Sequence, residues 1–76
     1  MKFYCIGGED AVRGFRLAGV AGRAVAGAEE AAAALDEASA SPDCGVIIMT
    51  RAAAGLVREK VEEIKLERAR PLIVEI

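Results

Sequence analysis

Residues 45–49 read Gly-Val-Ile-Ile-Met, a continuous apolar run with three β-branched side chains in a row. β-branched residues favour extended backbone, and an unbroken apolar run of this length is typical of a strand that is buried on both faces. Parallel sheets that carry helices on both faces bury their strands in this way. The run therefore predicts the central strand of an α/β sheet.

Three other segments have the properties of strands. Residues 3–6 (Phe-Tyr-Cys-Ile) form a second short apolar run, which is closed by a Gly-Gly turn. Residues 20–26 (Val-Ala-Gly-Arg-Ala-Val-Ala) form a weaker strand, in which Gly22 favours a position at the edge of the sheet. Pro71 opens the last strand, residues 72–74 (Leu-Ile-Val).

Helices are predicted between these strands. A helix of about ten residues begins at Glu9, because acidic side chains are favourable at a helix N-terminus, and it ends at Gly19. Residues 28–40 are rich in strong helix formers and stop at a Ser-Pro pair, which predicts a second helix.

A single helix is predicted after the central strand, with Thr50 as its N-cap. Its apolar stripe consists of Leu56, Val57, Val61 and Ile64. The residues expected to face water are Arg58, Glu59, Lys60, Glu62 and Glu63. A helix with this pattern packs one side on the sheet and leaves the other in solvent.

The order of these elements predicts one α/β domain over residues 1–76. Regular alternation of strands and helices implies parallel strands joined by right-handed crossovers. We predict a four-stranded parallel sheet in the order 2-1-3-4 with helices on both faces, which is a Rossmann-like or receiver-like fold. The topological switch point, where ligands bind in such sheets, then lies between the first and third strands.

The composition argues against several classes of function. A net charge of −2 and only 4% aromatic residues provide neither a basic footprint nor a stacking platform for nucleic acid. The sequence has no His, the commonest general base and a common metal ligand. No run approaches the roughly 18 apolar residues of a membrane span. We therefore expect a cytoplasmic chain that binds no nucleic acid, metal or cofactor and is not inserted in a membrane.

The residues at the switch point do not match a phosphate site. The Rossmann spacing GxGxxG is absent, and Glu9 and Asp10 would repel an anion. Receiver domains hold Mg²⁺ with an acid pair at this place, but they also need a phosphoacceptor Asp at the end of the third strand, where this sequence has Met49-Thr50-Arg51. A receiver-like or phosphotransfer signalling domain remains the alternative function.

Cys5 and Cys44 lie in or beside apolar runs, which is typical of buried reduced thiols. A phosphocysteine loop would need cationic surroundings, whereas the charges that follow Cys5 are acidic. A disulfide between the two cysteines lacks both a CxxC spacing and a secretory context. We expect both residues to be structural.

Residues 14–20 (GFRLAGV), preceded by residues 6–10 (IGGED), resemble the N-terminal signature of the F subunit of vacuolar/archaeal-type (V/A-type) ATPases and ATP synthases. Residues 43–50 and 71–76 resemble the third and last strands of that family. The resemblance implies a non-catalytic subunit of the rotating central stalk, peripheral to the membrane. It would bind the coiled-coil D subunit and contribute to coupling and regulation of ATP-driven ion transport or ATP synthesis. Relatives continue into a C-terminal helical segment that is absent from this sequence.

A partner-binding patch is predicted on the first helix. Leu17, beside Arg13 and Arg16, supplies an apolar anchor with a charged rim. Phe15, at helical spacing from Val12, is instead predicted to belong to the core. We also expect the isolated chain to self-associate through the second strand, the last strand or the Leu17 side of the first helix.

Overall fold

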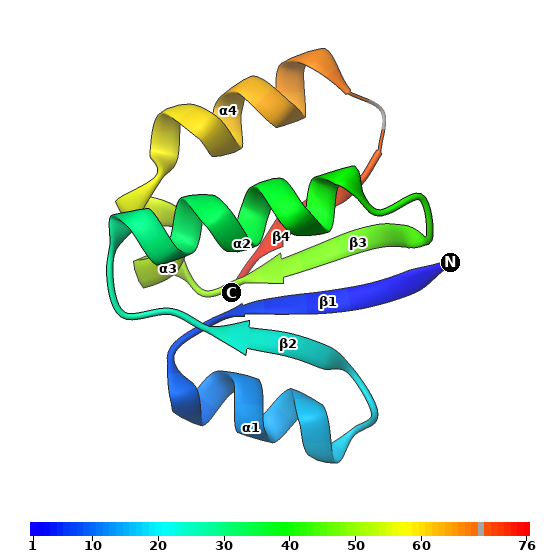
Figure 1. The fold of residues 1–76 in the computed structure, drawn as a ribbon, viewed down its shortest axis with the longest axis vertical. Coiled ribbons are helices and arrows are strands. Elements are labelled where there is room, and N and C mark those ends of the chain that lie inside the picture. Colours follow the sequence, from blue (N-terminus) through cyan, green and yellow to red (C-terminus); the bar gives the residue numbers. More distant parts are fainter. Residues whose placement is uncertain (69) are drawn as a thin grey trace.

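Residues 1–68 and 70–76, which the computed structural model describes, form four strands and four helices (Figure 1). In chain order these are β1 (Lys2–Gly7), α1 (Glu9–Leu17), β2 (Ala21–Ala24), α2 (Ala28–Ala40), β3 (Cys44–Met49), α3 (Arg51–Leu56), α4 (Arg58–Glu67) and β4 (Leu72–Glu75). The predicted helix over residues 28–40 is confirmed to the residue, and the predicted strands agree within one or two residues at most ends.

The strands form one parallel sheet in the order β2-β1-β3-β4, as predicted. The apolar run 45–49 lies in β3, between β1 and β4, and the diluted strand β2 lies at an edge. In register across three strands, Phe3 of β1 stands opposite Val46 of β3, which stands opposite Leu72 of β4. The switch point lies between β1 and β3, where the strand order reverses.

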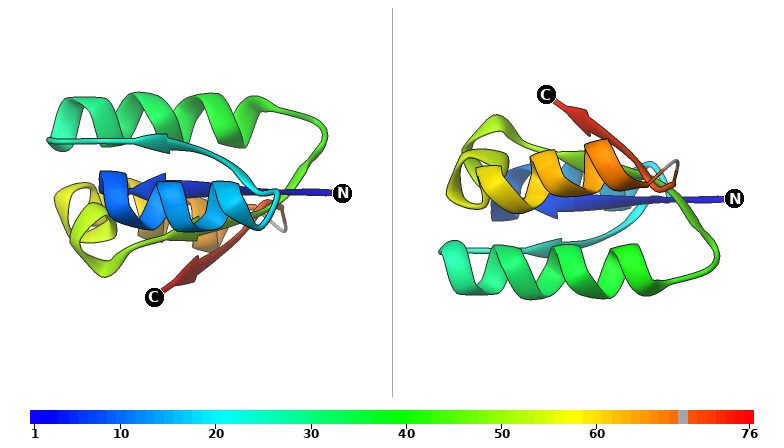
Figure 2. Two further views of the ribbon diagram at one scale, coloured as in Figure 1. Left: turned by 90° about the horizontal axis from the view of Figure 1, so that it is seen from below. Right: turned by 90° about the horizontal axis from the view of Figure 1, so that it is seen from above.

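The helices cover the two faces of the sheet unequally. Figure 2 shows α1 and α2 on opposite sides of β2. Helix α4 lies beside α2, and an ion pair of 2.7 Å between Lys60 Nζ and Asp36 Oδ1 joins the two helices. Right-handed crossovers place α1 on one face and α2 and α4 on the other. The connection from β1 to β2 through α1 runs in one direction along the sheet, and the connections from β2 to β3 and from β3 to β4 run in the opposite direction.

The main core lies between the sheet and the helices α2, α3 and α4. Its fully buried large side chains include Ile6, Leu35, Ile47, Met49 and Val61. Helix α2 presents small residues to this core, since Ala31, Ala34 and Ala38 are all buried. Small residues at a helix interface allow the backbone of the helix to approach the strands closely.

Helix α1 packs against β1 and β2 through the buried side chain of Val12. Gly22 of β2 makes this close packing possible, because a Cβ there would stand 2.7 Å from the Cys5 carbonyl oxygen and 3.3 Å from a Val12 methyl group. Gly19 ends the helix with φ +90, a conformation that favours glycine. Gly22, which weakens β2 by its low strand propensity, is therefore required by the close approach of β2 to both β1 and α1.

Helix α1 covers only β1 and β2 on its side of the sheet. On that side, β3 and β4 have no helix over them within residues 1–68 and 70–76. Successive strand residues point to opposite faces, and Ile47 and Ile73 are buried on the α2 side. Their neighbours therefore point to the uncovered side, as does Phe3, two residues before Cys5. We call this surface the open face; it consists of Phe3, Val46, Ile48, Leu72 and Val74.

The prediction of one continuous helix after β3 is wrong. The helix breaks at Val57, where φ −133 and ψ 40 are not helical, so that α3 and α4 are separate. Gly55 in the last turn of α3 has low helix propensity and favours the break. Because the helical phase restarts after Val57, Val61 and Ile64 are buried as predicted, whereas Leu56 is 47% exposed.

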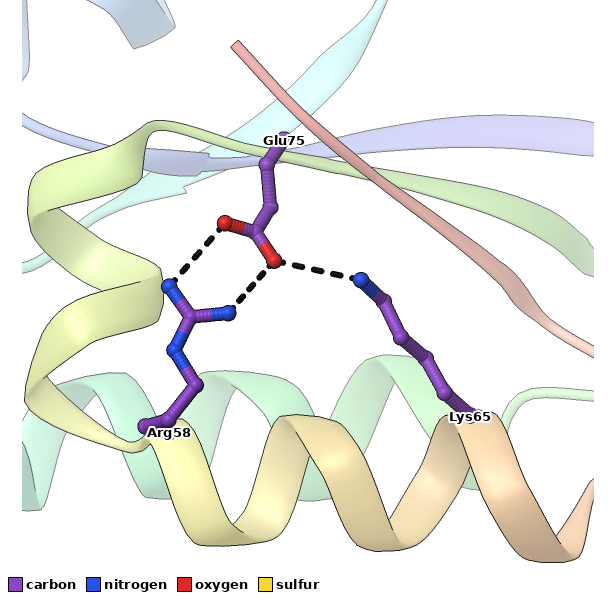
Figure 3. A network of polar contacts seen from close by, with 3 residues as sticks. All are labelled: Arg58, Lys65 and Glu75. Carbon is purple, nitrogen blue, oxygen red and sulfur yellow. Dashed lines mark hydrogen bonds and ion pairs between the residues drawn. The ribbon is translucent and has the colours of Figure 1, made fainter.

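The prediction that the charged residues of α4 face water is confirmed for four of the five, since Arg58, Glu59, Glu62 and Glu63 are exposed. Lys60 is half-buried in its ion pair with Asp36. Arg58 binds the carboxylate of Glu75 at the end of β4, and Lys65 binds the same carboxylate (Figure 3). These contacts hold β4 against α4. The predicted cap is confirmed, since Thr50 Oγ1 accepts a hydrogen bond of 3.2 Å from the Ala53 N–H.

Candidate partner interface

The switch point at the carboxyl ends of the strands is occupied by bonds within the chain. The Thr50 N–H donates to the Ile6 carbonyl at 3.1 Å, and the Val25 N–H donates to the Gly7 carbonyl at 2.9 Å. The Thr50 hydroxyl, at the place where a receiver carries its phosphoacceptor, caps α3. The Arg51 N–H donates to the Ile76 carbonyl at 2.9 Å. The backbone N–H groups of Val25, Thr50 and Arg51 are therefore engaged within the chain.

The two cysteines have the surroundings of structural thiols. Cys5 is fully buried and Cys44 is 9% exposed, and both are free thiols. Burial raises the pKa of each thiol above its usual value, which disfavours the thiolate that a nucleophile requires. Among the residues that the structure describes, no three Cys, Asp or Glu side chains gather in a way that would hold a metal ion.

The structure places the three predicted partner-binding residues on the outer side of α1. Arg13 and Arg16 line a shallow hollow together with Glu9, Val12 and Ala24. Arg16 Nη2 makes a long contact of 3.5 Å with the Gly22 carbonyl. Leu17 follows at the end of the helix and is 87% exposed. Arg13 and Leu17 are four residues apart, so the three side chains form one neighbouring group on the helix surface.

The open face is a second candidate interface, of which the sequence analysis named only the last strand, as a surface for self-association. Phe3 is 47%, Leu72 59% and Val74 40% exposed, while Val46 and Ile48 between them are half-buried. The register joins them into two rows, because Phe3, Val46 and Leu72 stand side by side and Ile48 stands beside Val74. Contiguous exposed apolar residues on a soluble fold mark an interaction surface.

A signal for the open face was present in the predicted topology. Right-handed crossovers in a sheet of order 2-1-3-4 place one helix on one face and two crossings on the other. The single helix cannot cover all four strands. The last strand also alternates, since buried Ile73 and paired Glu75 point to α4 while Leu72 and Val74 point away.

A protein-family model matches this chain. It describes the ATP synthase (F/14-kDa) subunit, and the match covers residues 4–76, which is nearly the whole chain. The chain belongs to this family. It is thus an F subunit of the V/A-type ATP synthases. Its partners are the other subunits of that complex. The resemblance carried by residues 6–10, 14–20, 43–50 and 71–76 is confirmed.

No curated protein matches the F-family chain in sequence. Within the described residues none of the F-family chain's helices combines the length and apolar character needed to cross a bilayer. Its longest helix is α2, with 13 residues. Family membership favours the assembly role over the alternative of a signalling receiver, in agreement with the cap formed by Thr50 at the switch point.

Proposed function

We propose that this F-family chain is a non-catalytic rotor subunit of the central stalk and binds the coiled-coil D subunit. One observation carries the proposal. At the switch point Thr50 bonds to Ile6 and caps α3, whereas many of the large exposed side chains, such as Leu17, Leu72 and Phe3, are apolar. A surface of this kind suits protein association rather than turnover of a small polar substrate.

In this role the chain contributes to coupling and regulation of the parent enzyme, which transports ions at the expense of ATP or synthesises ATP. It carries out no chemical step and requires no cofactor of its own. It acts at the cytoplasmic side, peripheral to the membrane, as part of the complex. Arg13, Arg16 and Leu17 on α1 remain proposed contact residues.

Co-expression with the D subunit of the same ATPase tests the proposal directly. We expect the two chains to elute together in size-exclusion chromatography at a 1:1 ratio and the isolated chain to turn over no ATP. An unrelated coiled coil of similar length and net charge is the control. Separate elution from the D subunit would contradict the proposed function, and so would ATP turnover that survives purification and is lost in Asp10→Asn.

A further inference from the structure

Two apolar surfaces lie on the same side of the sheet, and both are exposed. One is the open face, where Phe3, Leu72 and Val74 are exposed across β1 and β4. The other is the end of α1, where Leu17 is 87% exposed. They share a side because α1 covers β1 and β2 where β3 and β4 have no helix over them within the described residues. Contiguous exposed apolar surface on a soluble fold marks a site of association.

The outer side of α1 is suited to packing on another surface. Val12 is buried against the sheet, and at 3.6 residues per turn Asp10, Gly14 and Leu17 project from the opposite side. A Cβ at Gly14 would meet no described atom within 4 Å, so the backbone of α1 can be approached closely there. The outer side thus combines an acid at the start of the helix, a small residue in its middle and a large apolar side chain at its end.

The uncovered half of the sheet matches α1 in length. The nine residues of α1 extend about 14 Å, and the four residues of β4 extend about 13 Å. The chain itself provides the comparison, because the same helix already covers β2, the four-residue strand at the other edge. A second α1 helix therefore fits over β3 and β4 as the chain's own α1 fits over β1 and β2.

We propose that two copies of this chain pair about a twofold axis parallel to the strands, each placing the outer side of its α1 on the open face of the other, with Leu17 against Phe3 and Leu72. Such an interface is isologous, since each copy gives the surface that it also receives. The two α1 helices then lie side by side between the two sheets. The side of α1 that faces the other helix is the one away from Glu9 and Arg13, and it carries no charge: Ala11, Phe15 and Ala18.

Charges at the carboxyl end of the sheet favour this orientation. Helix α1 begins at that end with Glu9 and Asp10, and Arg51 directly follows β3 there. Asp10 and Arg51 form no ion pair within the described residues. In the proposed dimer Asp10 of each copy lies beside Arg51 of the other, with Glu9 adding a second acid. Opposite charges at the rim of an interface favour the encounter and fix its orientation.

Charges at the amino end are mixed and have less influence. Three charged residues precede the strands there: Lys2 before β1, Asp43 before β3 and Arg70 before β4. Helix α1 ends at this place, and its Arg16 is directed to the Gly22 carbonyl of its own chain at 3.5 Å. The charges of the two sheets are separated by a helix about 10 Å across, a distance over which salt screens exposed charges. The reversed orientation would lose the contact of Asp10 with Arg51.

The proposed dimer has a consequence for assembly. It covers Leu17 and the open face, the apolar surfaces on which the proposed binding to the D subunit depends. The second copy and the D subunit would then compete, and the free chain would have to separate before it enters the complex. Pairing requires no other subunit, so the chain alone tests it, and its failure would leave the proposed function standing.

Sedimentation equilibrium at protein concentrations up to about 1 mM measures the dissociation constant of the dimer. Leu17→Glu places an acid against the open face of the other copy, and Leu66→Glu on α4, where Leu66 is 86% exposed, is the matched control. We expect the wild type to dimerise, Leu17→Glu to raise the Kd about tenfold or more, and the control to change it less than about twofold. Thermal melting checks that each variant folds, and Leu17→Ser replaces Leu17→Glu if that variant is unfolded.

A charge exchange tests the orientation of the two copies. Asp10→Arg and Arg51→Asp each bring like charges together at two places in the dimer, and each should raise the Kd about fivefold or more at low salt. The double variant restores opposite charges and should return the Kd to within about twofold of the wild type. Glu29→Arg is the matched control for Asp10→Arg, because Glu29 is also exposed and also the second residue of its helix.

Three results would contradict the proposed dimer. A wild-type chain that stays monomeric at about 1 mM does not pair in this way. A dimer that Leu17→Glu leaves unchanged uses another surface. A double variant that associates no more tightly than Asp10→Arg alone shows that Asp10 does not lie beside Arg51 of the other copy.

Discussion

The guanidinium group of Arg58 donates two hydrogen bonds to the carboxylate of Glu75, from Nη1 to Oε2 at 2.6 Å and from Nη2 to Oε1 at 3.0 Å (Figure 3). Arg58 begins α4 and Glu75 ends β4, so the pair joins the last strand to the helix that precedes it. Because strand residues alternate, directing Glu75 toward α4 directs Val74 to the open face. The ion pair thus helps to define which side of β4 is left for a partner.

This pair predicts an acid-sensitive fold. The Arg58 bond first, and then the Lys65 bond, lower the pKa of Glu75 from its usual 4.5 to about 2. A carboxyl whose folded-state pKa lies below its unfolded value stabilises the fold above the unfolded value, and this contribution is lost as the pH falls through the folded value. We expect the melting temperature of the wild type to fall between about pH 5 and pH 2 more steeply than that of Glu75→Gln. Glu59→Gln is the control, and equal slopes in all three proteins would contradict the assignment.

A core prediction concerns the central strand. Ile47 of β3 is fully buried, so Ile47→Ala removes packed atoms and leaves a cavity; we expect it to cost about 2 to 5 kcal/mol of unfolding free energy. Exposed Glu59, replaced by Ala, should change stability by no more than about 0.5 kcal/mol. Urea denaturation measures both. Similar midpoints for the two variants would mean that Ile47 is not at the centre of the core.

Two glycines provide a matched pair for the packing of α1. A Cβ at Gly22 of β2 would meet the Cys5 carbonyl oxygen of β1 at 2.7 Å and a Val12 methyl group of α1 at 3.3 Å, so Gly22→Ala forces β2 away from both neighbours and should cost about 1 to 3 kcal/mol. A Cβ at Gly14 meets nothing within 4 Å, and Gly14→Ala should stabilise the helix by about 0.5 to 1 kcal/mol. Opposite shifts of the urea midpoint are the expected result. Destabilisation by Gly14→Ala would show that a side chain at position 14 collides with a neighbouring group on the outer side of α1.

Local patterns predicted most of the fold because they coincide with the tertiary packing. The run 45–49 is apolar on both faces and lies centrally, and residues 28–40 combine strong helix formers with a clear stop. The break at Val57 was missed because Leu56, Val57 and Val61 have the spacing of a continuous stripe. Whether such a stripe continues depends on how α3 turns away from β3, which is a property of the whole packing.

The candidate interface was harder to predict for a related reason. A sequence shows that Leu72 is apolar but not that the helix which would cover it is missing. Leu17 stood out because charged residues surround it, whereas the open face is assembled from three strands that are distant in sequence. Register between parallel strands depends on crossovers, so Phe3, Val46 and Leu72 could be joined only in the folded structure.

The arginines on the outer side of α1 should affect the rate at which the D subunit is captured. Arg13 and Arg16 lie at the rim, in an exposed hollow with Glu9, and rim charges act mainly on association and its salt dependence. We expect Arg13→Glu with Arg16→Glu to slow association and to weaken the dependence of the association rate on ionic strength, while dissociation changes little. Leu72→Glu should instead accelerate dissociation, since truncated or replaced apolar anchors act on the off-rate. Surface plasmon resonance at two salt concentrations separates the two effects. Faster dissociation in the arginine variant, with an unchanged association rate, would move the centre of the interface from the open face to α1.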